Sequence, residues 1–112
     1  MNRCTLGTDK TLLFYCPGCE EAHGIPVDGS RGWNWNGSLE SPTVTPSILV
    51  GGVVYGPDKL SFSQYKGPYP CETTPHVCHS FVTDGRIQYL GDCTHALVGT
   101  TVDLPEWDTA FD

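Results

Sequence analysis

Two motifs in this chain of 112 residues place cysteine and histidine at spacings that could do chemistry. The first is the Cys16-Pro-Gly-Cys19 motif, and the second begins at Cys78-His79 and ends at Cys93-Thr-His95. Two thiolates three positions apart, around a tight Pro-Gly turn, can hold one tetrahedral Zn²⁺. A redox dithiol has the same spacing but needs a following helix, and the segment "EEAHGIPVDG" interrupts one. The motif therefore favours structural zinc over a redox pair.

The remaining ligands must come from far along the chain. Asp84-Gly85 predicts a two-residue hairpin turn, which pairs Cys78 with Gly91 and His76 with Cys93 on one face. We expect structural Zn²⁺ to be bound by Cys16, Cys19, Cys78 and Cys93. Three histidines are alternative ligands, namely His23, His76 and His95. Iron can also occupy four-thiolate sites, and Cys78 as a buried free thiol is the competing interpretation.

The other face of the same hairpin carries His79 and Asp92 as diagonal neighbours. A carboxylate that orients an imidazole makes a general base, which then needs a nucleophile or an activated water. The chain contains neither G-x-S-x-G nor H-E-x-x-H, so known hydrolase motifs do not identify the nucleophile. Ser47 follows Pro46, whose fixed backbone can present a hydroxyl, but a serine after proline is usually a turn residue.

The elements that must position these side chains are strands. Thirteen Gly and nine Pro argue against long helices. We predict a mainly β fold, a small single domain (residues 1–112) of short antiparallel strands and hairpins joined by the zinc knuckle. Expected strands cover 11–15, 42–50, 51–56, both arms around Asp84-Gly85, and 96–105. Asn36-Gly37 predicts a further two-residue hairpin turn, and residues 57–76 a long loop.

Charge and hydropathy argue against nucleic-acid binding, secretion and membrane insertion. A net charge of −7 disfavours nucleic acid as a partner. The N-terminal residues lack the apolar stretch of a signal peptide, and no run approaches the roughly 18 apolar residues of a membrane span. We therefore expect a cytoplasmic protein without a membrane partner.

Four segments resemble a family of small phage and prophage proteins of unknown function. They are "LLFYCPGCEEAHGIPV", "GWNWNGSLESPTVTPSIL", "CHSFVTDGRIQYLGDCTHALVG" and "TTVDLP". This family is distantly similar to the serine-peptidase-like component of bacterial ubiquitination-like operons. Those relatives share a Pro-Ser-Ile that matches Pro46, Ser47 and Ile48, and a Ser-His pair whose histidine matches His79. They differ in having serine at the position of Cys78, a denser C-x-C-G-C motif, and a further cysteine near His76.

The resemblance implies that Ser47 is the nucleophile and His79 its base, and Asp92 then orients His79. The expected substrate is a peptide or ester at the tail of a ubiquitin-like protein, in the cytoplasm of a bacterial host. A different class of function stays open, in which a zinc-stabilised protein binds and blocks a host protein without catalysis. Zinc as a catalytic Lewis acid is a third interpretation, and it requires an open coordination position.

Overall fold

The computed structural model describes residues 1–110, and within them every regular element is a β-strand. A three-stranded sheet contains β1 (Cys4–Leu6), β2 (Thr11–Cys16) and β3 (Glu21–Pro26) in that order. A five-stranded sheet contains β4 (Asn34–Trp35), β5 (Val44–Tyr55), β6 (Thr73–Thr83), β7 (Arg86–Tyr89) and β8 (Thr101–Asp103). All pairings are antiparallel, so the predicted mainly β fold is confirmed.

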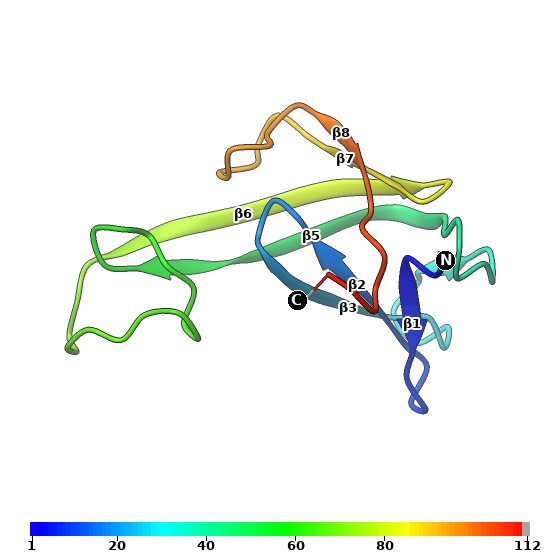
Figure 1. Ribbon diagram of the computed structural model, residues 1–112, viewed down its shortest axis with the longest axis horizontal. Helices are drawn as coiled ribbons and strands as arrows, with labels where there is room; N and C mark the ends of the chain where they lie inside the picture. The colour runs from blue at the N-terminus through cyan, green and yellow to red at the C-terminus, as the bar shows by residue number, and fades with distance from the viewer. Residues whose placement is uncertain (111–112) are drawn as a thin grey trace.

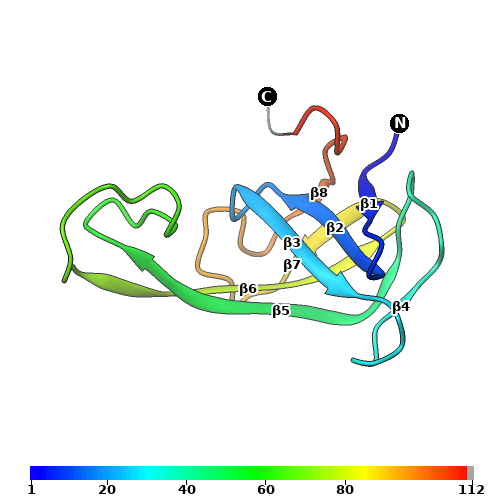
Figure 2. The same cartoon turned by 90° about the horizontal axis from the view of Figure 1, so that it is seen from below.

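Strands β5 and β6 form a long paired ribbon that sets the long axis of the molecule (Figures 1 and 2). The longest extent is 42 Å, close to the roughly 40 Å that a twelve-residue strand spans. We expected two strands here, at 42–50 and 51–56, and that prediction was wrong. Gly51 and Gly52 stay in the ladder, opposite Val77 and His76, because neither adopts a positive φ that would break it.

The hairpin between β6 and β7 has the predicted turn. Asp84 and Gly85 both have positive φ, 51° and 77°, and Thr83 pairs with Arg86. β4 and β5 also pair as an antiparallel hairpin, but the two-residue turn predicted at Asn36-Gly37 was wrong. Asn36 Oδ1 instead accepts hydrogen bonds from Ser38 N and from Thr43 N, both 3.1 Å, and this closes a wider loop before β5.

The two sheets pack face to face around one hydrophobic core. Alternation in β6 sends Cys78, Ser80 and Val82 inward, where all three are buried. They meet buried residues from the small sheet: Leu12, Phe14, Cys16 and Ile25. We call this side of β5 and β6 the inner face and the opposite, solvent-facing side the outer face.

Residues 1–110 include no helix with the length and apolar character needed to cross a bilayer.

Candidate functional site

Ser47 lies in an irregular stretch of β5. The ladder with β6 shifts register between the pairs Val44–Val82 and Ile48–Ser80. Three residues of β5, 45–47, therefore oppose Phe81 alone, which is the geometry of an extended β-bulge. The indole Nε1 of Trp33 donates a hydrogen bond to the Ser47 carbonyl oxygen at 3.3 Å. The bulge takes Ser47 out of the regular ladder, and this indole holds its backbone in place.

A chain of hydrogen bonds links Ser47, His79 and Asp92 on the outer face. Ser47 Oγ lies 3.0 Å from His79 Nε2, and His79 Nδ1 lies 3.0 Å from Asp92 Oδ2. An ionised carboxylate only accepts, so Nδ1 carries the proton and Nε2 is left to accept from the serine hydroxyl. The His79 side chain is 27% exposed and that of Asp92 is 55% exposed, so the chain of bonds is open to solvent on this face.

The turn after β7 holds the backbone of His79. β7 ends at Tyr89, earlier than the predicted pairing of Cys78 with Gly91 required. Leu90 N then donates to His79 O at 2.9 Å, and Cys93 Sγ lies 3.2 Å from both His79 N and His79 O. The Cys93 thiol therefore pairs with both backbone polar groups of His79, where a longer β7 would have continued the ladder.

The inner face carries a compact group of metal-ligating side chains. One ligand atom from each of Cys16, Cys19, His23 and Cys78 lies within 4.8 Å of the other three. The Cys16 and Cys78 sulfurs are 3.9 Å apart, close to the roughly 3.8 Å edge of a tetrahedron with Zn–S bonds of about 2.3 Å. His23 is 5% exposed, and its Nε2 has no hydrogen-bond partner. A buried nitrogen without a partner is costly, and a metal ion would satisfy it.

The thiols of Cys16, Cys19 and Cys78 lie close enough together to change one another's pKa. Hydrogen bonds from Cys19 and then Cys78 lower the pKa of Cys16, and hydrogen bonding to Cys16 raises the pKa of Cys19 and of Cys78. The direction of these shifts favours the charged form at Cys16 over the other two sulfurs. Three thiolates this close would repel each other unless a cation lay between them. The donor set fits a closed Cys₃His zinc site.

This group differs from the predicted ligands at one position, because His23 stands where we expected Cys93. Cys93 belongs to a second group of three, with Cys78 and His95, and its sulfur is engaged with the His79 backbone. The physical reason is the early end of β7, which lets the turn at 90–93 fold back under β6. His23 sits on β3 opposite Phe14, hence on the same side of the β2–β3 hairpin as Cys16. Recognising residues 21–26 as a strand would have revealed this.

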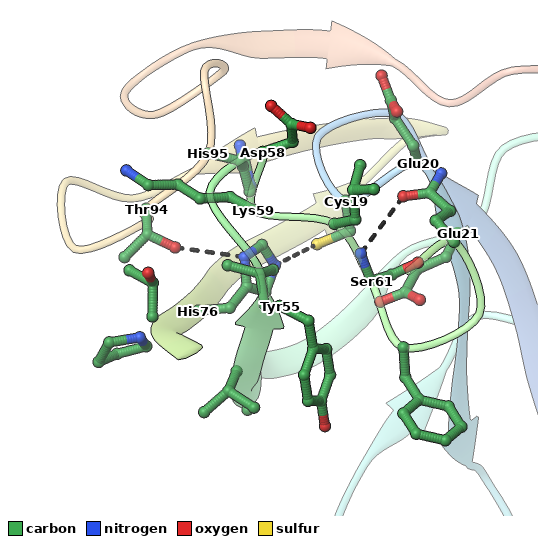
Figure 3. A pocket seen from close by; sticks show the side chains of 18 of the residues that line it. Cys19, Glu20, Glu21, Tyr55, Asp58, Lys59, Ser61, His76, Thr94 and His95 are labelled. Carbon is green, nitrogen blue, oxygen red and sulfur yellow. Dashed lines mark hydrogen bonds between the residues drawn. The ribbon is translucent and has the colours of Figure 1, made fainter. Parts of the chain in front are cut away.

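The other two histidines lie at the margin of the metal-ligating group. His76 Nε2 is 3.1 Å from Cys19 Sγ, and its Nδ1 is 3.4 Å from Thr94 Oγ1 (Figure 3). His95 packs so tightly on the Cys-Pro-Gly-Cys turn that a Cβ at Gly18 would lie 2.3 Å from its ring. The cavity drawn in Figure 3, about 720 Å³, opens beside both histidines, and the Ser47–His79–Asp92 chain is not part of its lining.

Tyr89 supports the turn in a way the sequence did not reveal. Its hydroxyl accepts from Gly18 N at 3.0 Å and lies 3.1 Å from Cys16 Sγ. The tyrosine comes from β7, more than seventy positions further on. No local pattern around the Cys-Pro-Gly-Cys motif could have identified it.

Comparison with known proteins identifies the family. No curated protein and no solved structure matches the chain. The family model described as "bacterial ubiquitination-like system serine protease (BubE)" matches residues 2–90, a segment that includes Ser47, His79 and the four-residue Cys/His group and ends just before Asp92. Because this match covers most of its length, the chain belongs to the BubE family of bacterial ubiquitination-like systems.

Proposed function

We propose that this protein is a serine hydrolase of the peptidase type, with Ser47 as nucleophile, His79 as general base and Asp92 as the residue that orients His79. The observation that carries the proposal is the pair of 3.0 Å hydrogen bonds that joins the three side chains in the order serine, imidazole, carboxylate. The family name supports the same reaction class.

In this mechanism Ser47 Oγ attacks the substrate's carbonyl carbon while its proton passes to His79 Nε2. The new C–O bond gives a tetrahedral intermediate, which collapses when the leaving amine or alcohol takes that proton. A water molecule then attacks the acyl-enzyme, again with His79 as base, and returns free Ser47. Asp92 accepts the Nδ1 hydrogen bond throughout and stabilises the imidazolium that forms.

We further propose that the group formed by Cys16, Cys19, His23 and Cys78 binds structural zinc. Four protein donors leave no open position, so the ion would contribute folding free energy rather than act on the substrate. The Lewis-acid interpretation is less well supported, because Ser47 and His79 form their hydrogen bond on the opposite face of the sheet.

The substrate class follows from the family name alone. A protease of a ubiquitination-like system acts on a protein conjugate or precursor, so we propose an acyl group at the tail of a ubiquitin-like protein. The six free cysteines suit a reducing cytoplasm. Phage or prophage origin stays a prediction from the resemblance.

Labelling with a fluorophosphonate probe tests the nucleophile. The wild type should be labelled and Ser47→Ala should not. Ser63→Ala is the matched control, because Ser63 is exposed and its hydroxyl lies 3.2 Å from Ser61 Oγ, away from His79. Equal labelling of wild type and Ser47→Ala would overturn the assignment.

A further inference from the structure

On the outer face, β5 and β6 carry a row of uncharged residues that runs along the strands past His79. Direct partners in an antiparallel pair project from the same side, and the ladder pairs Leu49 with His79, Gly51 with Val77 and Val53 with Pro75. Phe81 lies two positions beyond His79 on β6, again on that side. We call this set the outer strip: Leu49, Gly51, Val53, Pro75, Val77 and Phe81.

The composition of the outer strip is unusual for a solvent-facing sheet. Leu49 is 63% exposed, Val53 45% and Phe81 40%. None of its six residues is charged, in a chain with 13 acidic and 6 basic residues. The exposed face of an antiparallel sheet is normally polar, and an exposed apolar patch marks an interaction site. The small sheet packs against the opposite face, so it does not cover the strip.

Gly51 leaves room at the middle of the strip. A Cβ added there would meet no atom within 4 Å, and its φ is not positive, so the backbone does not require glycine. The same holds for Gly52, the next residue, which faces the other way. The chain therefore offers two neighbouring positions where a side chain can be added without a clash, one on each face.

We infer that the outer strip binds the polypeptide segment of the substrate next to the scissile bond, an extended segment with uncharged, apolar side chains. The inference rests on the proposed function. A carbonyl carbon attacked by Ser47 must lie beside His79, so the adjoining chain has to pass over the strip. From Leu49 to Val53 the strip runs about 13 Å, enough for roughly four extended residues. Leu49 is the specificity-determining contact, because it stands directly opposite His79.

Binding can be measured apart from turnover in the Ser47→Ala background. The probe is a fluorescein-labelled ten-residue peptide in which Leu alternates with Ser, compared with peptides carrying Glu or Lys at the Leu positions. We expect the Leu peptide to bind at least about tenfold more tightly than either charged peptide, as measured by fluorescence anisotropy. Gly51→Tyr and Leu49→Asp should each weaken binding by roughly tenfold or more, and Gly52→Tyr should not. Circular dichroism of each variant checks that the fold is retained.

Equal effects of Gly51→Tyr and Gly52→Tyr, or no preference for the Leu peptide, would overturn the inference. A concentration-dependent dimer that Gly51→Tyr dissociates would also overturn it, because a second copy would then occupy the strip. Fluorophosphonate labelling keeps the two proposals apart. If Ser47 is not the nucleophile, labelling will not depend on Ser47. If the outer strip does not bind the peptide, anisotropy will show no binding preference while Ser47 is still labelled.

Discussion

Cys78 and His79 are neighbours in β6, yet their side chains enter opposite environments. Cys78 points to the inner face, 1% exposed, in a group whose His23 nitrogen lacks a partner. His79 points to the outer face, 27% exposed, with both ring nitrogens hydrogen-bonded. The inner group needs a cation to be satisfied, whereas the outer chain of hydrogen bonds is complete without one. We infer that β6 separates stabilisation from chemistry by strand alternation alone.

Removal of the metal from the inner face should give the largest loss of stability. Zinc binding by such sites is worth about 10–16 kcal/mol, comparable to or above the roughly 5–15 kcal/mol stability of a whole domain. A strong chelator should therefore unfold the chain, as followed by elemental analysis and thermal melts. Cys78→Ser should lose zinc. Cys4→Ser is the matched control, because burial raises the pKa of Cys4 to about 11 and it lies outside the group. A metal-free protein with an unchanged melting temperature would contradict this prediction.

The next largest effect should be on the reactivity of Ser47 on the outer face, without a change in stability. Asp92→Asn replaces the carboxylate, which can only accept, with an amide whose NH₂ can donate to Nδ1 and stabilise the wrong tautomer of His79, so phosphonylation of Ser47 by the fluorophosphonate should slow by roughly 10⁴-fold. The melting temperature should stay the same, because Asp92 is 55% exposed. Asp103→Asn, which loses the surface pair with Arg86, should be phosphonylated at the normal rate. If the two variants behave alike, Asp92 does not orient His79.

Cys93 lies near Cys78 of the inner group and also contacts the backbone of His79. Its substitution should cause an intermediate loss of stability. Cys93→Ala leaves the backbone N–H of His79 without its sulfur partner, at a cost of about 1–3 kcal/mol measured by urea unfolding. Zinc content should stay complete, because the inner group has its four donors without Cys93. Cys93→Ser, which keeps a donor and acceptor, should recover part of the loss. Zinc loss in Cys93→Ser would instead restore Cys93 as a ligand.

The smallest effect should come from the indole that holds the Ser47 backbone. Trp33→Phe removes one hydrogen bond, worth about 0.5–1.5 kcal/mol, and should slow phosphonylation of Ser47 by the fluorophosphonate roughly two- to tenfold. Trp35→Phe is matched to it, since Trp35 Nε1 donates to Ser38 O at 3.0 Å, away from Ser47. A lower rate in Trp33→Phe alone would identify Trp33 as a positioning residue. Equal labelling rates in Trp33→Phe and Trp35→Phe would mean that Trp33 has a structural role only.

The local sequence was sufficient to predict the structure where a single turn, or the alternation of side chains along a strand, decides it. Asp84-Gly85 fixed the β6–β7 register, because both positions tolerate positive φ, and strand alternation then assigned His79 and Cys78 to opposite faces. The same local reasoning failed at Gly51-Gly52 and at Asn36-Gly37. At Gly51-Gly52 pairing with the distant strand β6 outweighs the turn preference of the dipeptide, and at Asn36-Gly37 the Asn36 side chain instead binds Ser38 N and Thr43 N and widens the loop.

By itself, then, the sequence determined the mainly β class, the Cys-Pro-Gly-Cys turn, the hairpin that carries His79, and the family resemblance that singled out Ser47. Only the tertiary structure decided how distant segments meet. The bulge at residues 45–47 brings Ser47 Oγ to His79, and docking of the β2–β3 hairpin on the inner face brings His23 to Cys78. The reason is physical: alternation fixes the face on which a side chain lies, but the end of a ladder and the packing of one sheet on another depend on contacts between residues far apart in the chain.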